Sequence, residues 1–164
     1  MTTLPELVVG WIGAPKYPIT SMRVEEGMVW TFCAAVEDGA DLHWRSASET
    51  GVPARTPQTM LSVWSRPDNW SPTGVPPGAL QTHFDLKREL GLPEAIISRY
   101  ALTLHDPVLI GDVLRVYEVI KKVSEPKTTR LGHGRFWDIE VVFERPDGGL
   151  AGTETYTAFG YNRE

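Results

Sequence analysis

Hydrophobic and polar residues follow different patterns in the two parts of the chain. From about residue 96 onward they alternate, in segments rich in valine, isoleucine, threonine and aromatic residues, as in half-buried β-strands. In one segment the apolar Trp137, Ile139 and Phe143 alternate with acidic residues, so one face of that strand is expected to be buried. The pattern predicts four strands, at 97–104, 113–123, 135–144 and 150–161, with a hairpin turn at 146–149 between the last two.

A helical period precedes these strands. Four apolar residues recur at i, i+3, i+4 and i+7, which predicts a helix over 25–37 with one apolar face: Val29, Phe32, Cys33 and Val36. Asp38 and Gly39 are a typical stop signal, so the helix is expected to deliver Asp38 into a loop. A second helix of about two turns is predicted at 84–90, before Gly91.

The remaining segments are less regular. Residues 45–82 contain six prolines, which predicts a loop-rich excursion over the surface. The apolar run 59–65 within it fits either a short helix or a strand. The segment before residue 25 is punctuated by glycine and proline, and we assign no regular element to it. Helix and loops first, then consecutive antiparallel strands, predict the α+β class.

Composition and charge limit the classes of function. With 164 residues, the chain is expected to form a single domain over 1–164. A net charge of -5 argues against a nucleic-acid partner, which needs a surplus of clustered cations. One basic cluster exists, and it is interpreted as a solvated strand edge in preference to a contact for the phosphate group of a ligand: Lys121, Lys122, Lys127 and Arg130.

Motifs of several common site types are missing from the sequence. Cys33 is the only cysteine, so an internal disulfide is impossible and a reducing compartment is expected. No apolar segment approaches 18 residues and no signal-peptide pattern is present, so no membrane association is expected and the cytoplasm is the default location. Dinucleotide, phosphate-loop, zinc-protease and hydrolase-elbow motifs are also absent.

Asp38 and His43 are the residues that could carry chemistry. They lie five positions apart in one loop, where a carboxylate and an imidazole can converge on a single water molecule. A neutral histidine can take a proton from that water, while the carboxylate orients it. On spacing alone, a turn-forming aspartate and a packed histidine remain the more common interpretation.

A family resemblance changes the weight of these alternatives. The segment 38–43, DGADLH, resembles the D-x-N-P-aliphatic-H motif of the MaoC-like, (R)-specific enoyl-CoA hydratases, in which the aspartate and the histidine are the catalytic pair. The segment 105–114, HDPVLIGDVL, resembles the family's Pro-Val-xx-Gly-Asp-x-Leu sequence at the start of a strand. Ala40 and Asp41 stand where the family has asparagine and proline, so an extra carboxylate is expected near the pair. The resemblance covers nearly the whole chain.

The C-terminal segment 130–161 is similar to a subgroup of dehydratase-like domains that act on bulky CoA thioesters, including those of steroid side-chain breakdown. That subgroup often has tyrosine at the position of His43 and often serves as a non-catalytic partner, so the histidine here favours catalysis. The resemblance implies the hot-dog fold, a curled antiparallel β-sheet wrapped around a central helix. Hot-dog domains generally pair, so a homodimer or a heteromer with a second hot-dog subunit is expected.

The resemblance also implies a reaction. It is the hydration of a trans-2-enoyl-CoA, or the dehydration of the 3-hydroxyacyl-CoA, with His43 as base, Asp38 positioning the water and relaying a proton to C2, and backbone N–H groups holding the thioester oxygen. No metal or redox cofactor is required, and CoA is part of the substrate. The AHGM-like segment that provides the family's oxyanion donors is missing from this sequence, and PQTM, 57–60, lies in about that region. The predicted substrate-binding residues are Trp44, Thr59, Met60, Trp64, His133 and Gly134.

Several alternatives stay open at this point. Trp44, Trp64 and Trp70 either line a broad acyl pocket or pin the proline-rich excursion to the sheet. His83, His105 and His133 are expected to face solvent, although His133 also fits a position near the CoA nucleotide. For the chain as a whole, the alternatives to a hydratase are a non-catalytic subunit that shapes the acyl pocket of a heteromer, an acyl-CoA binding module and an acyl-CoA thioesterase.

Overall fold

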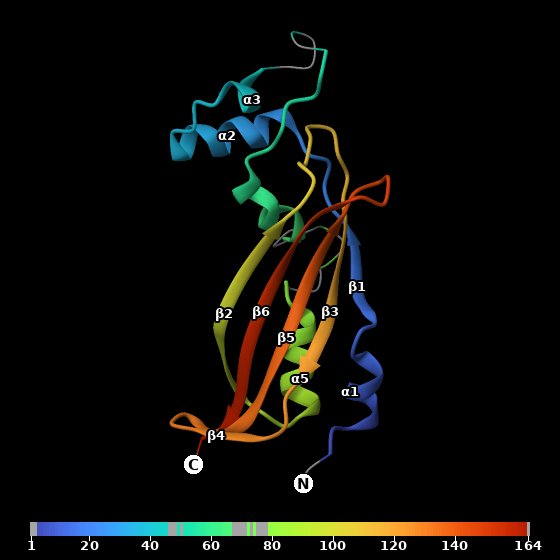
Figure 1. Cartoon of the computed structure of the whole chain (residues 1–164), viewed down its shortest axis with the longest axis vertical. Helices are drawn as coiled ribbons and strands as arrows, with labels where there is room; N and C mark the ends of the chain where they lie inside the picture. Colours follow the sequence, from blue (N-terminus) through green and yellow to red (C-terminus); the bar gives the residue numbers. More distant parts are fainter. Residues whose placement is uncertain are drawn as a thin grey trace.

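The computed structural model describes residues 3–45, 49, 51–66, 72, 74 and 79–163. The strands of this part of the chain form one antiparallel sheet in the order β1-β3-β5-β6-β2, with the short β4 beside β5 (Figure 1). The strands are β1 (Pro15–Thr20), β2 (Glu94–Leu104), β3 (Arg115–Val123), β4 (Lys127–Thr129), β5 (Gly132–Glu144) and β6 (Leu150–Asn162). The four predicted strands are therefore present, with ends shifted by up to three residues.

One face of the sheet is buried, as the alternation predicted. Trp137, Ile139 and Phe143 of β5 are almost fully buried. Their neighbours across the ladder, such as Ala158 beside Trp137, lie on the same face. The predicted hairpin turn is also present, with the N–H of Arg145 donating to the carbonyl of Gly149 at 2.8 Å.

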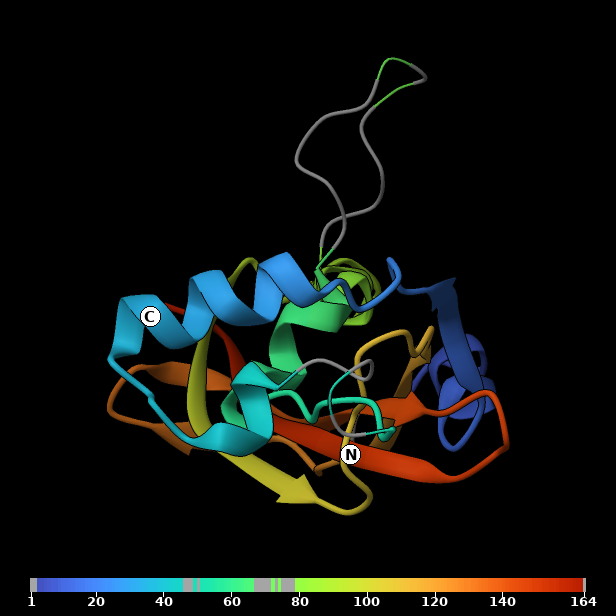
Figure 2. The same cartoon turned by 90° about the horizontal axis from the view of Figure 1, so that it is seen from above.

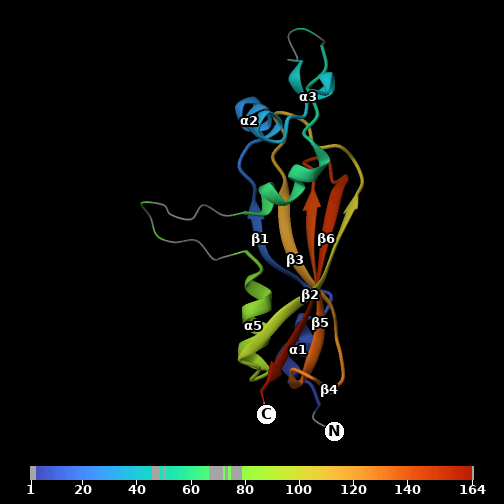
Figure 3. The same ribbon diagram turned by 90° about the vertical axis from the view of Figure 1, so that its left-hand side faces the viewer.

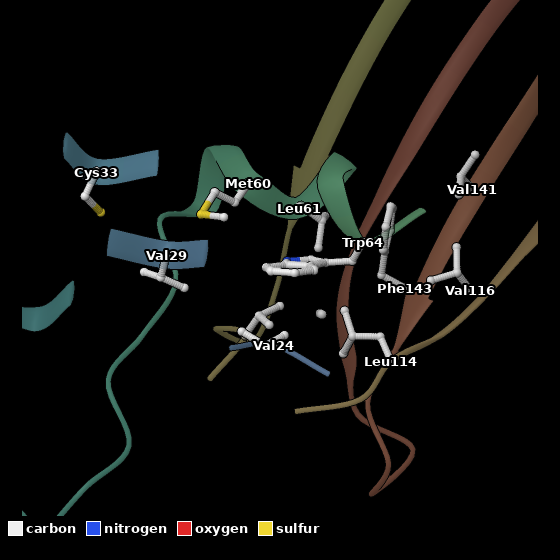
Figure 4. Packing of buried hydrophobic residues seen from close by; sticks show 12 residues of the cluster. Val24, Val29, Cys33, Met60, Leu61, Trp64, Leu114, Val116, Val141 and Phe143 are labelled. Atoms are coloured by element: carbon white, nitrogen blue, oxygen red, sulfur yellow. The ribbon is translucent and has the colours of Figure 1, made fainter. Parts of the chain in front are cut away.

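Two short helical segments cover this inner face (Figure 3). The 3-10 helix η1 (Gln58–Ser65) packs on one half of the sheet, and α5 (Gln81–Glu89) packs on the other half. Trp64 of η1 is the largest side chain of the first core cluster, where its ring lies among Val24, Leu61, Leu114 and Phe143 (Figure 4). Leu86 of α5 belongs to the second cluster, with Trp137 and Ile139. The central helical layer on this sheet is thus divided into two pieces.

The helix α2 (Glu26–Val36) lies across one end of the sheet, next to the short α3 (Asp41–Trp44) (Figure 2). The predicted apolar face is partly confirmed, since Val29 and Cys33 are buried in the first core cluster. Val36 is 56% exposed because it is the last residue of α2 and the helix ends beyond the core. Burial raises the pKa of the Cys33 thiol, so this cysteine is an inert core residue.

The structure decides one alternative that the sequence left open and adds two elements that the sequence did not predict. The run 59–65, for which helix and strand were both open, is the 3-10 helix η1. The segment before residue 25, to which no element was assigned, contains α1 (Glu6–Trp11) and the strand β1. Pro15 and Pro18 are compatible with β1 because it is an edge strand whose pairing with β3 is irregular between Lys16 and Ile19.

The predicted basic cluster lies along strands β3 and β4. The Nζ atoms of Lys121 and Lys122 each lie 3.0 Å from a carboxylate of the neighbouring strand, on Glu140 and Asp138. These cross-strand ion pairs agree with the interpretation as a solvated part of the sheet. Within the described ranges, no helix has the length and apolar character that a membrane crossing requires.

Candidate functional site

The backbone at the end of α2 fixes the position of Asp38. Glu37 adopts a left-handed conformation with φ of 59°, and the N–H of Asp38 donates to the carbonyl of Cys33 at 2.9 Å. This closes the helix in the manner of a C-terminal cap. One carboxylate oxygen of Asp38 then accepts the N–H of Ala40 at 3.0 Å. The other oxygen, Oδ2, is left to face the start of α3.

His43 presents one ring nitrogen to that oxygen. Its Nε2 lies 3.5 Å from Oδ2 of Asp38, and its side chain is 10% exposed against 35% for Asp38. Its Nδ1 lies 2.7 Å from the carbonyl oxygen of Arg55. A carbonyl oxygen only accepts hydrogen bonds, so Nδ1 carries the proton and Nε2 of the neutral ring has a free lone pair. The predicted pair is therefore brought together, with the basic nitrogen on the side of the carboxylate.

Two tryptophans hold the loop between Asp38 and His43. Trp44 donates its indole N–H to the backbone carbonyl of Asp38 at 2.7 Å, and Trp30 donates to that of His43 at 3.1 Å. Their rings are stacked with centroids 6.2 Å apart. Trp44 thus has a positioning contact, and the residue is also 38% exposed beside the pair. Sequence reasoning missed Trp30, because it lies outside the apolar face of α2 that the spacing identified.

The carboxylate of Asp41, which replaces the family's proline, is engaged by a cation. Nη2 of Arg45 lies 2.5 Å from Oδ2 of Asp41, one helical turn away, and both side chains are largely exposed. An ion pair of this kind lies on the surface and leaves Asp38 as the carboxylate next to His43. Sequence reasoning expected Asp41 near the site but gave no indication that Arg45 would pair with it.

Arg55, whose carbonyl oxygen binds His43, lies in the segment that leads into η1. Arg55 forms a bridge with Leu109, and the N–H of Thr56 donates to the carbonyl of Val108 at 2.9 Å. Two residues later η1 begins, where the first N–H groups of a helix have no acceptor within the helix. Thr59, a predicted substrate-binding residue, is exposed in this first turn, whereas Met60 is buried in the core.

The other predicted binding residues lie elsewhere. Trp64 is buried in the first core cluster, and Trp70 lies outside the described residues. His133 and Gly134 begin β5, at the end of the sheet opposite to α2 and α3 (Figure 1). Gly134 has a packing reason of its own, since a Cβ there would lie 1.9 Å from the carbonyl oxygen of Gly160 on β6. In one copy of the chain these two residues are thus separated from Asp38 and His43.

His83 was expected to face solvent, and that expectation is wrong. The side chain is half-buried beside Trp137, whose indole N–H donates to its Nδ1 at 3.3 Å. Burial, and next the charge of Lys87, lower the pKa of His83 below its ordinary value of 6.5. His105 and His133 are exposed, as expected. Among the described residues, no three histidine, cysteine or acidic side chains gather where they could hold a metal ion.

Comparisons with known proteins identify the fold. No protein-family model matches the sequence, and neither does the sequence of any curated protein. Solved structures do match. A chain of the ChsH1-ChsH2 complex from Mycobacterium tuberculosis superposes with a TM-score of 0.74 at 21% identity, covering 97% of this chain and 91% of the other.

Two further solved structures give the same result. The HadBC (3R-hydroxyacyl-ACP dehydratase) complex from M. tuberculosis has a TM-score of 0.60 at 20% identity, with 92% of this chain and 97% of the other covered. The (R)-hydratase from A. caviae has a TM-score of 0.55 at 17% identity, with 90% and 94% covered. The chain therefore has the hot-dog fold of the MaoC-like dehydratases and (R)-hydratases, as the resemblance predicted.

Proposed function

We propose that this chain is a MaoC-like hydratase that adds water to a trans-2-enoyl-CoA, or removes it from the 3-hydroxyacyl-CoA, with Asp38 and His43 as its catalytic pair. The observation that carries the proposal is the contact of His43 Nε2 with Asp38 Oδ2 at 3.5 Å, while Nδ1 is held by the carbonyl of Arg55. This arrangement leaves the basic nitrogen and the carboxylate oxygen on one side of the loop, where both can contact one water molecule.

In the proposed reaction, His43 and Asp38 each act once, in hydration and in dehydration. Nε2 of His43 takes a proton from the water as its oxygen attacks C3 of the enoyl thioester. The electron pair of the double bond moves to C2 and onto the thioester oxygen, and the proton returns through the pair to C2. Asp38 orients the water and relays that proton, so the water is divided between C3 and C2 and both residues end in their starting states.

The thioester oxygen carries negative charge during this step and needs donors. The first N–H groups of η1, at Gln58 and Thr59, are the proposed donors, because His43 is hydrogen-bonded to Arg55 just before η1 begins. Backbone N–H groups fixed at a helix start stabilise a developing oxyanion without a metal ion. PQTM, 57–60, would therefore take the role of the family's oxyanion segment.

A second candidate function is that of a non-catalytic subunit in a heteromer. It is favoured by the neighbours named ChsH1-ChsH2 and HadBC, which are complexes of two different chains. The edge strand β2 offers a surface for either kind of pairing, since it pairs only with β6 among the described strands. Ile96, Ile97 and Tyr100 on this strand are each more than 40% exposed. An exposed edge presents unpaired N–H and C=O groups, which can pair with a strand of another chain.

The experiment that separates the two functions is a hydration assay of the purified chain with a short and a bulky trans-2-enoyl-CoA. The loss of enoyl absorbance measures the rate. Turnover by the chain alone supports the hydratase. Turnover that requires a second hot-dog chain, and that is unchanged in Asp38→Asn and His43→Ala, assigns this chain the supporting role. Binding of CoA thioesters with thermal stabilisation and without turnover in either mixture would indicate an acyl-CoA binding module. Release of free CoA would instead indicate a thioesterase.

A further inference from the structure

A cavity of about 170 Å³ lies in the gap of the central helical layer, between the end of η1 and the start of α5. Ser65 and Arg66 line it from the η1 side, and Leu80 lines it from the α5 side. The buried Val116 and Val141 of the sheet border its inner side. A cavity of about 150 Å³ is large enough for a benzene molecule, so this one can hold a group of several carbon atoms.

One row of residues across the sheet puts polar groups beside this apolar space. Glu118, Val141 and Glu154 are paired side by side on β3, β5 and β6, and all three border the cavity. Both oxygens of Glu118 are engaged, because they accept the N–H groups of Gln81 and Thr82 at the start of α5. Glu118 therefore holds α5 in place and has a structural role.

Glu154 is fully buried, and it fixes the hydroxyl group of a tyrosine that lines the cavity. The Tyr156 hydroxyl donates to Oε2 of Glu154 at 3.0 Å, while Tyr100 donates to Oε1 at 2.8 Å. A hydroxyl group has one proton, so the oxygen of Tyr156 can only accept a hydrogen bond from anything else that reaches it. Burial and the charge of Glu154 raise the pKa of Tyr156, which keeps this hydroxyl protonated at neutral pH.

The helix η1 connects the region of the catalytic pair with the cavity. The hydrogen bond from His43 to Arg55 ties the pair to the start of η1, and Ser65 at its end lines the cavity. The eight residues of η1 span about 16 Å at roughly 2 Å each. About a dozen methylene groups, joined by bonds of about 1.5 Å, cover this length in a zigzag chain.

We propose that this cavity binds the far end of a long acyl group and that Tyr156, positioned by Glu154, accepts a hydrogen bond from a hydroxyl group on that end. The proposal rests on the proposed function for the place of the thioester. The ligand group is a donor, because the oxygen of Tyr156 can only accept, and a methyl group would leave that oxygen without a donor. It is a neutral donor, because an ammonium group would lose its hydration in an apolar space whose carboxylates, Glu118 and Glu154, already accept two hydrogen bonds each.

Two saturated thioesters that differ only in the terminal group test this inference by binding, without any need for turnover. The probes are hexadecanoyl-CoA and 16-hydroxyhexadecanoyl-CoA, titrated calorimetrically into the wild-type protein. We expect the hydroxylated probe to bind about threefold to tenfold more tightly, the usual effect of one neutral hydrogen bond. Equal dissociation constants, or no binding of either probe, would overturn the inference.

Three variants test whether the preference for the hydroxylated probe depends on Tyr156 and Glu154. Tyr156→Phe keeps the ring and removes the oxygen, so the preference for the hydroxylated probe is expected to disappear. Glu154→Gln, which can donate as well as accept, is expected to reduce the preference because it no longer fixes the hydroxyl proton of Tyr156. Tyr100→Phe is the matched control, since it removes the other bond to Glu154 from a residue that does not line the cavity, and it should keep the preference.

The outcomes separate this inference from the proposed function. A preference that survives in Tyr156→Phe would contradict the role of this residue, whatever the catalytic assay shows. Turnover of a short enoyl-CoA, which does not reach the cavity, tests the catalytic pair alone. If a short substrate is hydrated while the two saturated probes bind equally, the proposed function stands and the inference fails. If Tyr156→Phe is unstable in thermal unfolding, Glu154→Gln with its isosteric side chain decides the question by the same ratio.

Discussion

His43, in α3, and Asp38, just after α2, face each other with Nε2 of the imidazole 3.5 Å from Oδ2 of the carboxylate. The opposite nitrogen of the ring is fixed by the backbone carbonyl of Arg55. The hydrogen bond to Arg55 selects which nitrogen carries the proton, so the nitrogen that faces Asp38 is the unprotonated one in the neutral ring.

The first prediction concerns that tautomer. At a pH where the ring is neutral, the proton of His43 is expected on Nδ1, because the carbonyl of Arg55 can accept it and cannot donate. Nitrogen-15 chemical shifts of the imidazole, assigned by comparison with His43→Ala, measure this directly. A protonated Nε2 in the neutral ring would contradict the proposed role of that nitrogen as the base.

The second prediction separates a packing role of Gly134 from its predicted role in substrate binding. Gly134→Ala places a methyl group against the backbone of Gly160, and such overpacking destabilises a protein by about 1–3 kcal/mol. Chemical denaturation should show this loss. Gly10→Ala is the control, because a Cβ at that position in α1 meets no atom within 4 Å. Equal stability of the two variants would contradict the packing role.

The third prediction concerns the pH dependence of stability. The pKa of His83 is lowered in the folded state by burial, so the unfolded chain binds its proton at a higher pH than the folded chain does. Stability is therefore complete above about pH 6.5 and decreases as the pH falls below it, toward the lower pKa of the folded state. His83→Gln should flatten the dependence of the unfolding free energy on pH in this range. An unchanged slope would show that other groups cause the dependence.

The strands show how much of the fold could be predicted from the sequence. Alternation over β5 identified its buried face, because in an antiparallel strand with one solvated face the residues alternate between apolar, facing the core, and polar, facing solvent. The strand β1 was missed because Pro15 and Pro18 are tolerated only by its edge position, which the local sequence does not reveal. The run 59–65 was undecided because its length fits a helix or a strand equally.

The site was predicted in part for similar reasons. Asp38 and His43 are close in sequence, so their spacing and the family resemblance were enough to pair them. Arg55, whose carbonyl selects the tautomer, contributes only backbone and leaves no signal in its side chain. The relation of Tyr156 to Glu154 was missed because both lie within an alternating strand, where a polar residue is expected on the solvated face.

The fourth prediction concerns the edge strand β2. We expect the purified chain to form a dimer through this edge, and the double variant Ile97→Lys, Leu104→Lys to be a monomer, because lysines on an edge oppose pairing. Light scattering after size-exclusion chromatography measures the mass. Leu131→Lys changes a similarly exposed leucine in the turn before β5 and should remain dimeric. A wild-type chain that is monomeric alone would contradict the homodimer.

The most direct test of the central claim is the rate of enoyl-CoA hydration by Asp38→Asn and His43→Ala beside the wild-type chain. General acid–base catalysis contributes about 10²- to 10⁴-fold, so each variant is expected to lose activity by a factor in this range while keeping its folded state in circular dichroism. Asp41→Asn, which removes only the surface ion pair with Arg45, should retain wild-type turnover. Wild-type rates in both Asp38→Asn and His43→Ala would contradict the assignment of this pair as the catalytic residues.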